Sequence, residues 1–308
     1  MGIKEQEVII MKIILSRKGF DSSFGGVASP VFTQNGKFLS LPIPLNSPEA
    51  ERLGYDVSYN DLNLHGHNYG HLVQDLSRNK GKNKLNGEML VRLGLDLLKD
   101  VYPKRNTAWR PLFGQLGSAQ GHLRGQGIGR GDIFLFFGWY NWVRQEGGLY
   151  SYLKGEKPFH LLWGWFQVED VIDLDKPGNK IQEWMSYHPY FYMPGVKGKA
   201  LYLGAQDLVI DQKIIIENGG VGKFSEYREG LQLTKPGSGK CTDWLVPGFL
   251  YNEDKKKLPT YHQDLGRWKK EGEGYKLTAV SIGQEFVFDS EDHLGAVDWI
   301  VGLINKGI

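Results

Sequence analysis

The sequence is poor in cysteine, in long apolar runs and in net charge. Its one cysteine, Cys241, excludes an intrachain disulfide and a metal centre built from several thiolates, and it favours a reducing compartment such as the cytoplasm. The longest apolar segment, residues 133–139, is far short of the roughly 18 apolar residues that a membrane-spanning helix needs. Lys and Arg total 37 against 35 Asp and Glu, so any contact with nucleic acid is expected to be a local patch.

What the chain has in quantity is apolar and aromatic residues, 41% and 13% of its 308 residues. This is enough for a packed core and is not typical of a disordered chain. No linker rich in Pro, Ser or Gly divides the sequence, which indicates one domain over residues 11–308. Residues 1–10 carry charges and no extended apolar stretch, so we interpret them as an N-terminal extension and not as a secretory signal.

Short β-rich runs separated by turn residues dominate the rest of the chain. We predict strands at residues 12–16, 133–139, 161–168, 200–205, 213–218, 231–234, 277–282 and 284–289. The two aromatic runs among them are expected to pair, and Asn35-Gly36 predicts a hairpin. Helical spacing of apolar residues predicts one helix within 108–124 and an amphipathic helix over 292–306.

Because strands outnumber helices and do not alternate with them, the pattern predicts an α+β fold. We expect a single domain with a large mixed or antiparallel β-sheet, short connecting helices and a C-terminal amphipathic helix.

The densest polar group in the sequence is a set of histidines followed by an aspartate. His65 and His67 share a face if the chain is extended there, and His67, His71 and Asp75 share a face if it is helical. Neutral imidazole and carboxylate are good ligands for a divalent metal. We therefore predict a divalent-metal site with His65, His67 and His71, or an oriented base formed by His71 with Asp75. Histidines that hydrogen-bond in a loop or bind substrate directly are the alternative.

The loop that follows the first predicted strand is the second polar group. Arg17 offers a planar fork for phosphate or carboxylate, and Lys18 adds a point charge. Ser22 and Ser23 supply hydroxyl donors, and the glycines at 25–26 allow backbone amides to approach an anion. This loop suits a nucleotide phosphate, and a capped turn with solvated charges is equally compatible with it.

Two further polar groups and a set of tryptophans complete the candidates. Gln120 and His122, on the first predicted helix, have the chemistry to read a base edge or orient a water, or else they satisfy loop carbonyls. His262 and Glu285 offer a base and an acid near the C-terminal strand, although a glutamate facing water is the simpler interpretation. Trp139 belongs to a group of tryptophans that either line a base-sized aromatic pocket or pack in the core.

Several motifs, taken in order along the chain, resemble one family. They are MKIILSRKGFDSSFGGVASPVF, FGQLGSAQGHL, GDIFLFFGWY, LLWGWFQV, SYHPYF, LQLTKPG, LPTYH and IGQEFVFD. Together they resemble the nucleotide modification associated domain 3 family, from residue 11 to nearly the end of the chain. That family is associated by gene neighbourhood with systems that modify bases, or act on modified bases, in phage and bacterial DNA.

The resemblance extends to single polar positions. Where the family commonly shows His-Leu-Asp-Pro-Asp-Leu, this chain matches at His71 and Asp75 but has Val73 in place of the first Asp, which removes one carboxylate from an acidic metal cluster. The other matching polar positions are Arg17, Lys18, Asp21, Ser22, Gln120, His122, His188, His262, Gln284 and Glu285.

Sequence and resemblance together predict a domain that acts on or binds a modified or to-be-modified base in DNA, in a phage or bacterial DNA-modification or defence context. A non-catalytic reader of modified DNA and a metal-dependent nuclease acting on modified DNA are the alternatives. DNA or a nucleotide is the expected partner, and a membrane is not. The predicted catalytic residues are His71, Asp75, Asp21, Gln120, His122 and Glu285. The predicted substrate-binding residues are Arg17, Lys18, Ser22, Ser23, Trp139, His262 and Gln284.

Overall fold

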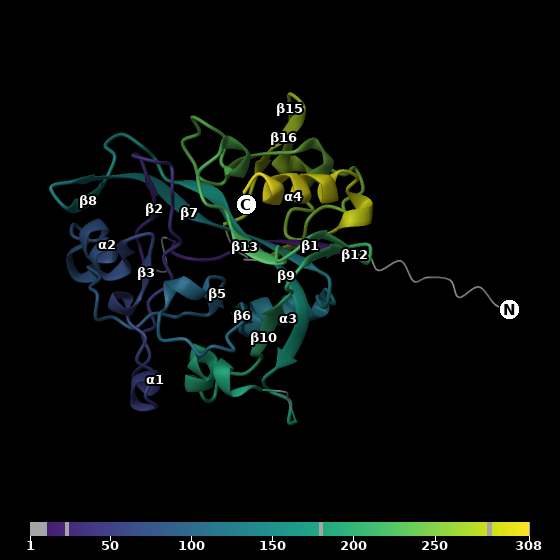
Figure 1. The fold of residues 1–308 in the computed structure, drawn as a ribbon. Helices are drawn as coiled ribbons and strands as arrows, with labels where there is room; N and C mark the ends of the chain where they lie inside the picture. The colour runs from purple at the N-terminus through teal and green to yellow at the C-terminus, as the bar shows by residue number, and fades with distance from the viewer. Residues whose placement is uncertain (1–10, 22–24, 179–180, 282–284, 308) are drawn as a thin grey trace.

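The computed structural model describes residues 11–21, 25–178, 181–281 and 285–307. Within these ranges a mixed sheet of ten strands crosses the middle of the molecule (Figure 1). Seven of them follow one another in the order β17 (Glu285–Asp289), β1 (Lys12–Arg17), β7 (Ile133–Glu146), β9 (Phe159–Asp173), β10 (Ala200–Gly204), β6 (Leu112–Gln115) and β5 (Leu95–Asp96). Three more attach beside this path, β2 (Ser29–Phe32) and β8 (Leu149–Tyr152) on β7 and β13 (Val221–Lys223) on β9.

The centre of the sheet is the pair of aromatic strands that the sequence predicts to lie together. β7 and β9 run antiparallel, with Phe134 opposite Phe166 and an irregularity between Phe136 and Phe137. β1 lies parallel to β7 and antiparallel to β17, so the sheet is mixed. The residues of β7 from 133 to 138 are buried, which explains why this strand reads as a continuous apolar run and not as an alternating one.

The remaining strands form three small sheets. They are β14 (Asp243–Val246), β16 (Gly274–Thr278) and β15 (Trp268–Glu271) in one, β11 (Leu208–Ile210) and β12 (Lys213–Ile216) in the second, and β3 (Asn63–Leu64) and β4 (His67–Asn68) in the third. The α-helices are α1 (Pro48–Arg52), α2 (Tyr69–Leu76), α3 (Gly117–Gly125) and α4 (Ala296–Asn305). Short 3₁₀ turns are η1 (Tyr59–Asp61), η2 (Gly81–Asn83), η3 (Lys99–Val101), η4 (Glu183–Tyr187), η5 (Pro189–Tyr192), η6 (Glu229–Leu231), η7 (Gly248–Leu250), η8 (Leu265–Arg267) and η9 (Ser290–Asp292).

Apolar side chains gather in a large cluster and two smaller ones. The large cluster joins β1, β7, β9 and β17 to α4 and the β14–β16 sheet, which lie above these strands in Figure 1. A second cluster packs α1, α2 and β2 together, and a third surrounds η4 and β10. The candidate site lies where the first two clusters meet, because residues of both line it.

The predicted fold class is confirmed, because a large mixed sheet, short helices and a C-terminal helix are all present. The predicted helix over 292–306 starts later than expected, at Ala296, so Leu294 precedes α4 and is 87% exposed, while Ile300, Leu303 and Ile304 are buried. Residues 231–234 form a 3₁₀ turn and isolated bridges, not a continuous strand. At Asn35-Gly36 the chain does reverse, but the second arm pairs only through the Val31–Phe38 bridge. None of the helices in the described ranges is long and apolar enough to cross a bilayer.

Candidate functional site

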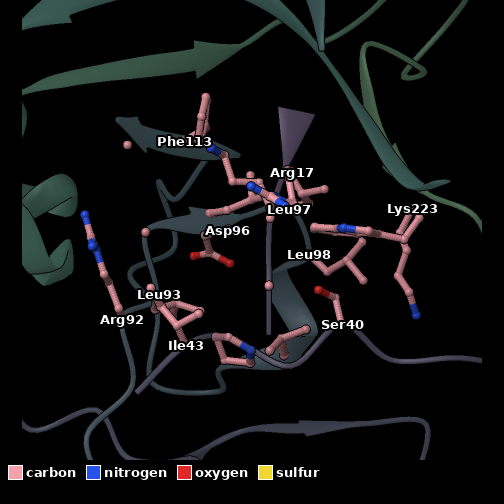
Figure 2. Close-up of a pocket in the computed structure, with 18 of the residues that line it drawn as sticks. Arg17, Ser40, Ile43, Arg92, Leu93, Asp96, Leu97, Leu98, Phe113 and Lys223 are labelled. Carbon is pink, nitrogen blue, oxygen red and sulfur yellow. The ribbon is translucent and has the colours of Figure 1, made fainter. Parts of the chain in front are cut away.

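A cavity of about 180 Å³ lies between the sheet and the second apolar cluster. Its walls come from β1 and the loop after it, from residues 40–43, from the β5 segment at 92–98, and from β6, β9, β13 and η5. Figure 2 shows Arg92 and Lys223 on opposite sides of this pocket, with Arg17 and Asp96 between them. The fold thus brings together polar residues from positions as far apart as Arg17 and Lys223.

Basic side chains are prominent in the lining of this pocket. Among the described residues they are Arg17, Lys18, Arg92 and Lys223. The Nη2 of Arg92 donates to the Tyr190 hydroxyl at 2.9 Å, and the guanidinium lies 5.2 Å from the centre of the Tyr190 ring. The Nη2 of Arg17 donates to the Ser281 carbonyl at 2.9 Å, and burial lowers the pKa of this arginine. Both guanidinium groups are therefore held in fixed orientations at the pocket wall.

Lys18 belongs to a buried polar network at the end of the pocket. Its Nζ lies 2.6 Å from Oε1 of Glu285, whose side chain is 1% exposed, and the Gln115 amide donates to the same oxygen. Burial lowers the pKa of Lys18, and the charge of Glu285 opposes that shift. The second carboxylate oxygen, Oε2, is buried without a hydrogen-bond partner among the described residues. A ligand N–H is the kind of group that would satisfy it.

Asp96, which also lines the pocket, is already fully engaged. Arg105 binds both of its oxygens, with Nη2 at 2.6 Å from Oδ1, and both side chains are almost completely buried. The Trp109 indole and the Tyr187 hydroxyl donate to Oδ2 at 3.1 and 2.8 Å. With its lone pairs used in this way, Asp96 supports the β5 wall and is not an available base.

Lys223 differs from Lys18 because no carboxylate pairs with it among the salt bridges of the described chain. Its Nζ donates to the Phe38 carbonyl and lies 5.0 Å from the centre of the Phe38 ring. Burial, reinforced by the charge of Lys37, lowers the pKa of Lys223 to about 7. A cation so placed gains from the arrival of an anion.

Aromatic side chains form the apolar part of the wall, contributed by Tyr69, Phe113, Trp163 and Tyr190. The indole N–H of Trp163 is buried and has no hydrogen-bond partner in the part of the chain that the structure describes. Such a donor costs free energy unless a ligand or water accepts from it. The wall therefore combines ring faces with an unsatisfied donor, which suits a flat heteroaromatic ligand.

His188 braces this wall from behind. It is completely buried, its Nδ1 accepts from the Tyr190 amide at 3.3 Å, and its Nε2 lies 3.3 Å from the Gly94 carbonyl. Burial lowers the pKa of His188 to about 3, so the ring is neutral. A side chain at Gly114 would meet this imidazole at 2.5 Å, which explains a glycine in the middle of β6.

The model of the nucleotide modification associated domain 3 family matches residues 12–289, a range that contains every lining residue of the pocket. The chain belongs to this family. Neither a curated protein nor a solved structure matches the chain. The family name links this member to nucleotide modification.

The structure brings part of the predicted site of this family member together. Arg17, Lys18 and Asp21 line the pocket, and Glu285 reaches it through Lys18. Ser22, Ser23 and Gln284 lie outside the described residues.

Sequence reasoning missed Arg92 and Lys223. Arg92 interrupts the apolar run LVRLG, and Lys223 lies between a glycine and the buried Phe224. A basic residue within an apolar segment is unusual, and this pattern could have indicated both pocket residues.

The histidines of the predicted metal site are not gathered as a ligand set. No three His, Cys, Asp or Glu side chains in the described ranges cluster as metal ligands. His67 stacks on Phe32 at 4.2 Å and its Nδ1 bonds the Tyr150 hydroxyl at 2.8 Å, while His65 is exposed at the β3–β4 turn. His71 is exposed on α2, away from the pocket lining. The reason is that α2 starts only at Tyr69, so His67 and His71 do not share a helix face.

Three other predicted residues, Asp75, Gln120 and His122, lie outside the pocket lining of this family member. Asp75 accepts the Tyr150 amide at 2.9 Å, and Gln120 accepts the Tyr202 hydroxyl at 2.9 Å. His122 bonds the Thr260 hydroxyl at 3.2 Å.

His262 and Trp139 are also outside the lining. His262 is buried, its Nε2 accepts from the Val280 amide at 3.2 Å, and burial lowers its pKa to about 4. Trp139 is half-buried on β7 opposite His160.

Proposed function

We propose that the pocket binds a nucleotide, and that this binding underlies the association of the domain with nucleotide modification. The observation that carries the proposal is the combination of cationic and aromatic side chains around one cavity. Two of the carboxylates nearby, Asp96 and Glu285, are already paired with Arg105 and Lys18. The pocket therefore retains positive charge for a phosphate and ring faces for a base.

Arg17 and Arg92 are the phosphate-binding pair in this proposal. The Arg92 guanidinium is oriented by its hydrogen bond to the Tyr190 hydroxyl, and a guanidinium has further N–H groups that can donate to an anion. The base stacks against the aromatic wall that Phe113 and Tyr190 contribute to, where the Trp163 N–H is a buried donor without a partner among the described residues. A base that accepts from this N–H would satisfy it.

The substrate in this proposal is a modified or to-be-modified base in DNA, in a phage or bacterial modification or defence context. An enclosed pocket admits such a base only when it is turned out of the duplex or lies in a single strand. Lys18, Asp21 and Glu285 are the groups that would carry proton transfer during modification or its removal.

A second function, reading a modified base without turnover, is favoured by one observation. The buried acid and base of the pocket, Glu285 and Lys18, neutralise each other at 2.6 Å. A pair held in this way orients a ligand well but is a poor starting point for chemistry.

Titration of nucleoside monophosphates and of short modified and unmodified DNA strands tests the proposal. We expect Arg92→Gln to weaken binding at least tenfold, because a charged hydrogen bond to phosphate is lost. Arg144→Gln is the matched control, since Arg144 lies at the end of β7 outside the pocket lining. Unchanged affinity in Arg92→Gln and Arg17→Gln would refute the nucleotide pocket. Mass spectrometry of nucleosides from treated DNA then separates enzyme from reader.

A further inference from the structure

His65 occupies an unfavourable backbone position. It forms a two-residue turn with Gly66 between β3 and β4, and both residues have positive φ, 52° and 80°. Turns of this kind strongly prefer Asn, Asp or Gly at the first position, because left-handed backbone strains most residues with a Cβ and these three tolerate it best. The His65 side chain is exposed, so burial of its ring does not repay the strain. A local rule broken at an exposed residue points to a role in binding.

The surroundings of His65 are unfavourable as well, because they are cationic. Partial burial and the charges of Lys223 and Lys37 all lower the pKa of His65. The charge of Lys37 also lowers the pKa of Lys223 and of His67. No acidic group contributes to the shifts of these three titrating residues.

Glu226 is the acidic residue that the backbone places opposite Lys37. No salt bridge joins the two side chains within the described parts of the chain. The like charges at this rim are thus not neutralised by a local ion pair.

These cations lead from the pocket to the surface. Lys223 lines the pocket, where Figure 2 shows it on the same side as Ser40. Its Nζ donates to Phe38, the residue after Lys37, and Lys37 is half-buried. The β3–β4 turn that carries His65 lies beside this segment, because His67 stacks on Phe32 and the Phe32 amide donates to the Lys37 carbonyl at 2.8 Å. His65 is exposed there, so basic side chains extend from the pocket lining to the exposed surface.

We propose that Lys223, Lys37 and His65 bind a phosphate that neighbours the nucleotide held in the pocket, so that the ligand is a nucleic-acid strand and not a free nucleotide. This inference rests on the proposed function. A phosphodiester at the rim offsets the repulsion between Lys223 and Lys37, favours the protonated form of His65 and gives this histidine a hydrogen-bond partner. A mononucleotide, whose one phosphate is bound by Arg17 and Arg92, leaves the rim unused.

The test compares ligands of increasing length in fluorescence anisotropy and calorimetry. The ligands are a nucleoside monophosphate, a trinucleotide of DNA and the same trinucleotide of RNA, the last two to distinguish the source of the phosphodiester. We expect His65→Asn and Lys37→Gln each to weaken trinucleotide binding about three- to tenfold and to leave monophosphate binding unchanged. In these variants the slope of log affinity against log salt concentration for the trinucleotide should decrease by about the value of one phosphate contact.

The melting temperature of His65→Asn is a second measurement, and it shows whether weaker binding comes from a loss of folding. Because Asn tolerates positive φ better than His, the melting temperature of this variant should equal or exceed that of the unchanged protein. Lys255→Gln is the control, since Lys255 is exposed and lies outside the pocket lining.

Two results overturn the inference. If monophosphate binds but His65→Asn and Lys37→Gln bind the trinucleotide as tightly as the unchanged protein, the rim has no role while the nucleotide pocket stands. If the unchanged protein binds neither ligand, the proposed function fails and this inference fails with it.

Discussion

At the scale of single residues, the pairing of Lys18 with Glu285 shows how the chain places charge inside an apolar sheet. β1 and β17 are neighbours, and their register puts Ser16 opposite Glu285, so the carboxylate lies beside Lys18, two residues further along the chain. Two buried charges tolerate each other only when both are present, because each alone carries an uncompensated desolvation cost. The pair therefore fixes the floor of the pocket.

Glu285→Ala is expected to destabilise the fold by about 3–5 kcal/mol, because it leaves the charge of Lys18 buried without a partner. The double variant Lys18→Met with Glu285→Ala should recover part of that loss. Urea unfolding followed by tryptophan fluorescence measures both.

The same two strands provide a matched control for this prediction. Lys12 pairs with Asp289 at the other end of β1 and β17, where the side chains are 26% and 38% exposed. For such a pair Asp289→Ala should cost less than about 1 kcal/mol. Equal losses in Glu285→Ala and Asp289→Ala would show that burial does not govern the Lys18 pair.

At the scale of elements, α2 connects to the sheet through a side chain that the sequence suggested for catalysis. Asp75 accepts the amide of Tyr150, which anchors the β7–β8 hairpin to the helix. Asn68 caps α2 by accepting the amide of His71, so the helix begins after His67. The polar residues of this segment thus hold the element in place.

Asp75→Ala should lower the free energy of unfolding by about 1–3 kcal/mol, because the Tyr150 amide loses its charged acceptor. Nucleotide affinity should stay unchanged. His71→Ala, at an exposed position of the same helix, should change neither quantity. Loss of turnover in both variants with stability retained would instead restore the oriented His71–Asp75 base that the sequence suggested.

At the scale of the whole molecule, the sheet was more predictable than the pocket. Strands such as β7 and β9 can be predicted from the sequence, because most of their residues are buried on both faces and form nearly continuous apolar runs. Arg17 and Lys18 were predictable because they stand in a basic loop directly after a strand. Arg92 and Lys223 come from distant segments, and only the strand order brings them to the same cavity. Sequence spacing carries no information about such convergence.

The buried histidines give the whole molecule a pH dependence. Burial lowers the pKa of His160 and His188 to about 3 and that of His262 to about 4. The unfolded chain therefore binds more protons than the folded one between pH 4 and about 6.5, and stability must fall as the pH falls through that window. Each histidine contributes a slope of about 1.4 kcal/mol per pH unit. Asp132 opposes this trend, because burial raises its pKa to about 6.

Urea unfolding at pH 7.5, 6.5 and 5.5 checks the balance of these groups. Three buried histidines lower the stability as the pH falls, and only Asp132 among these groups raises it, so the urea midpoint should decrease at each step. His262→Gln should flatten the decrease, because one of the titrating groups is gone, whereas His71→Gln should leave the slope unchanged, since His71 is exposed. A midpoint that is constant or rises toward pH 5.5 would mean that these imidazoles are not kept neutral by the fold, and the brace that His188 gives to the pocket wall would then need another explanation.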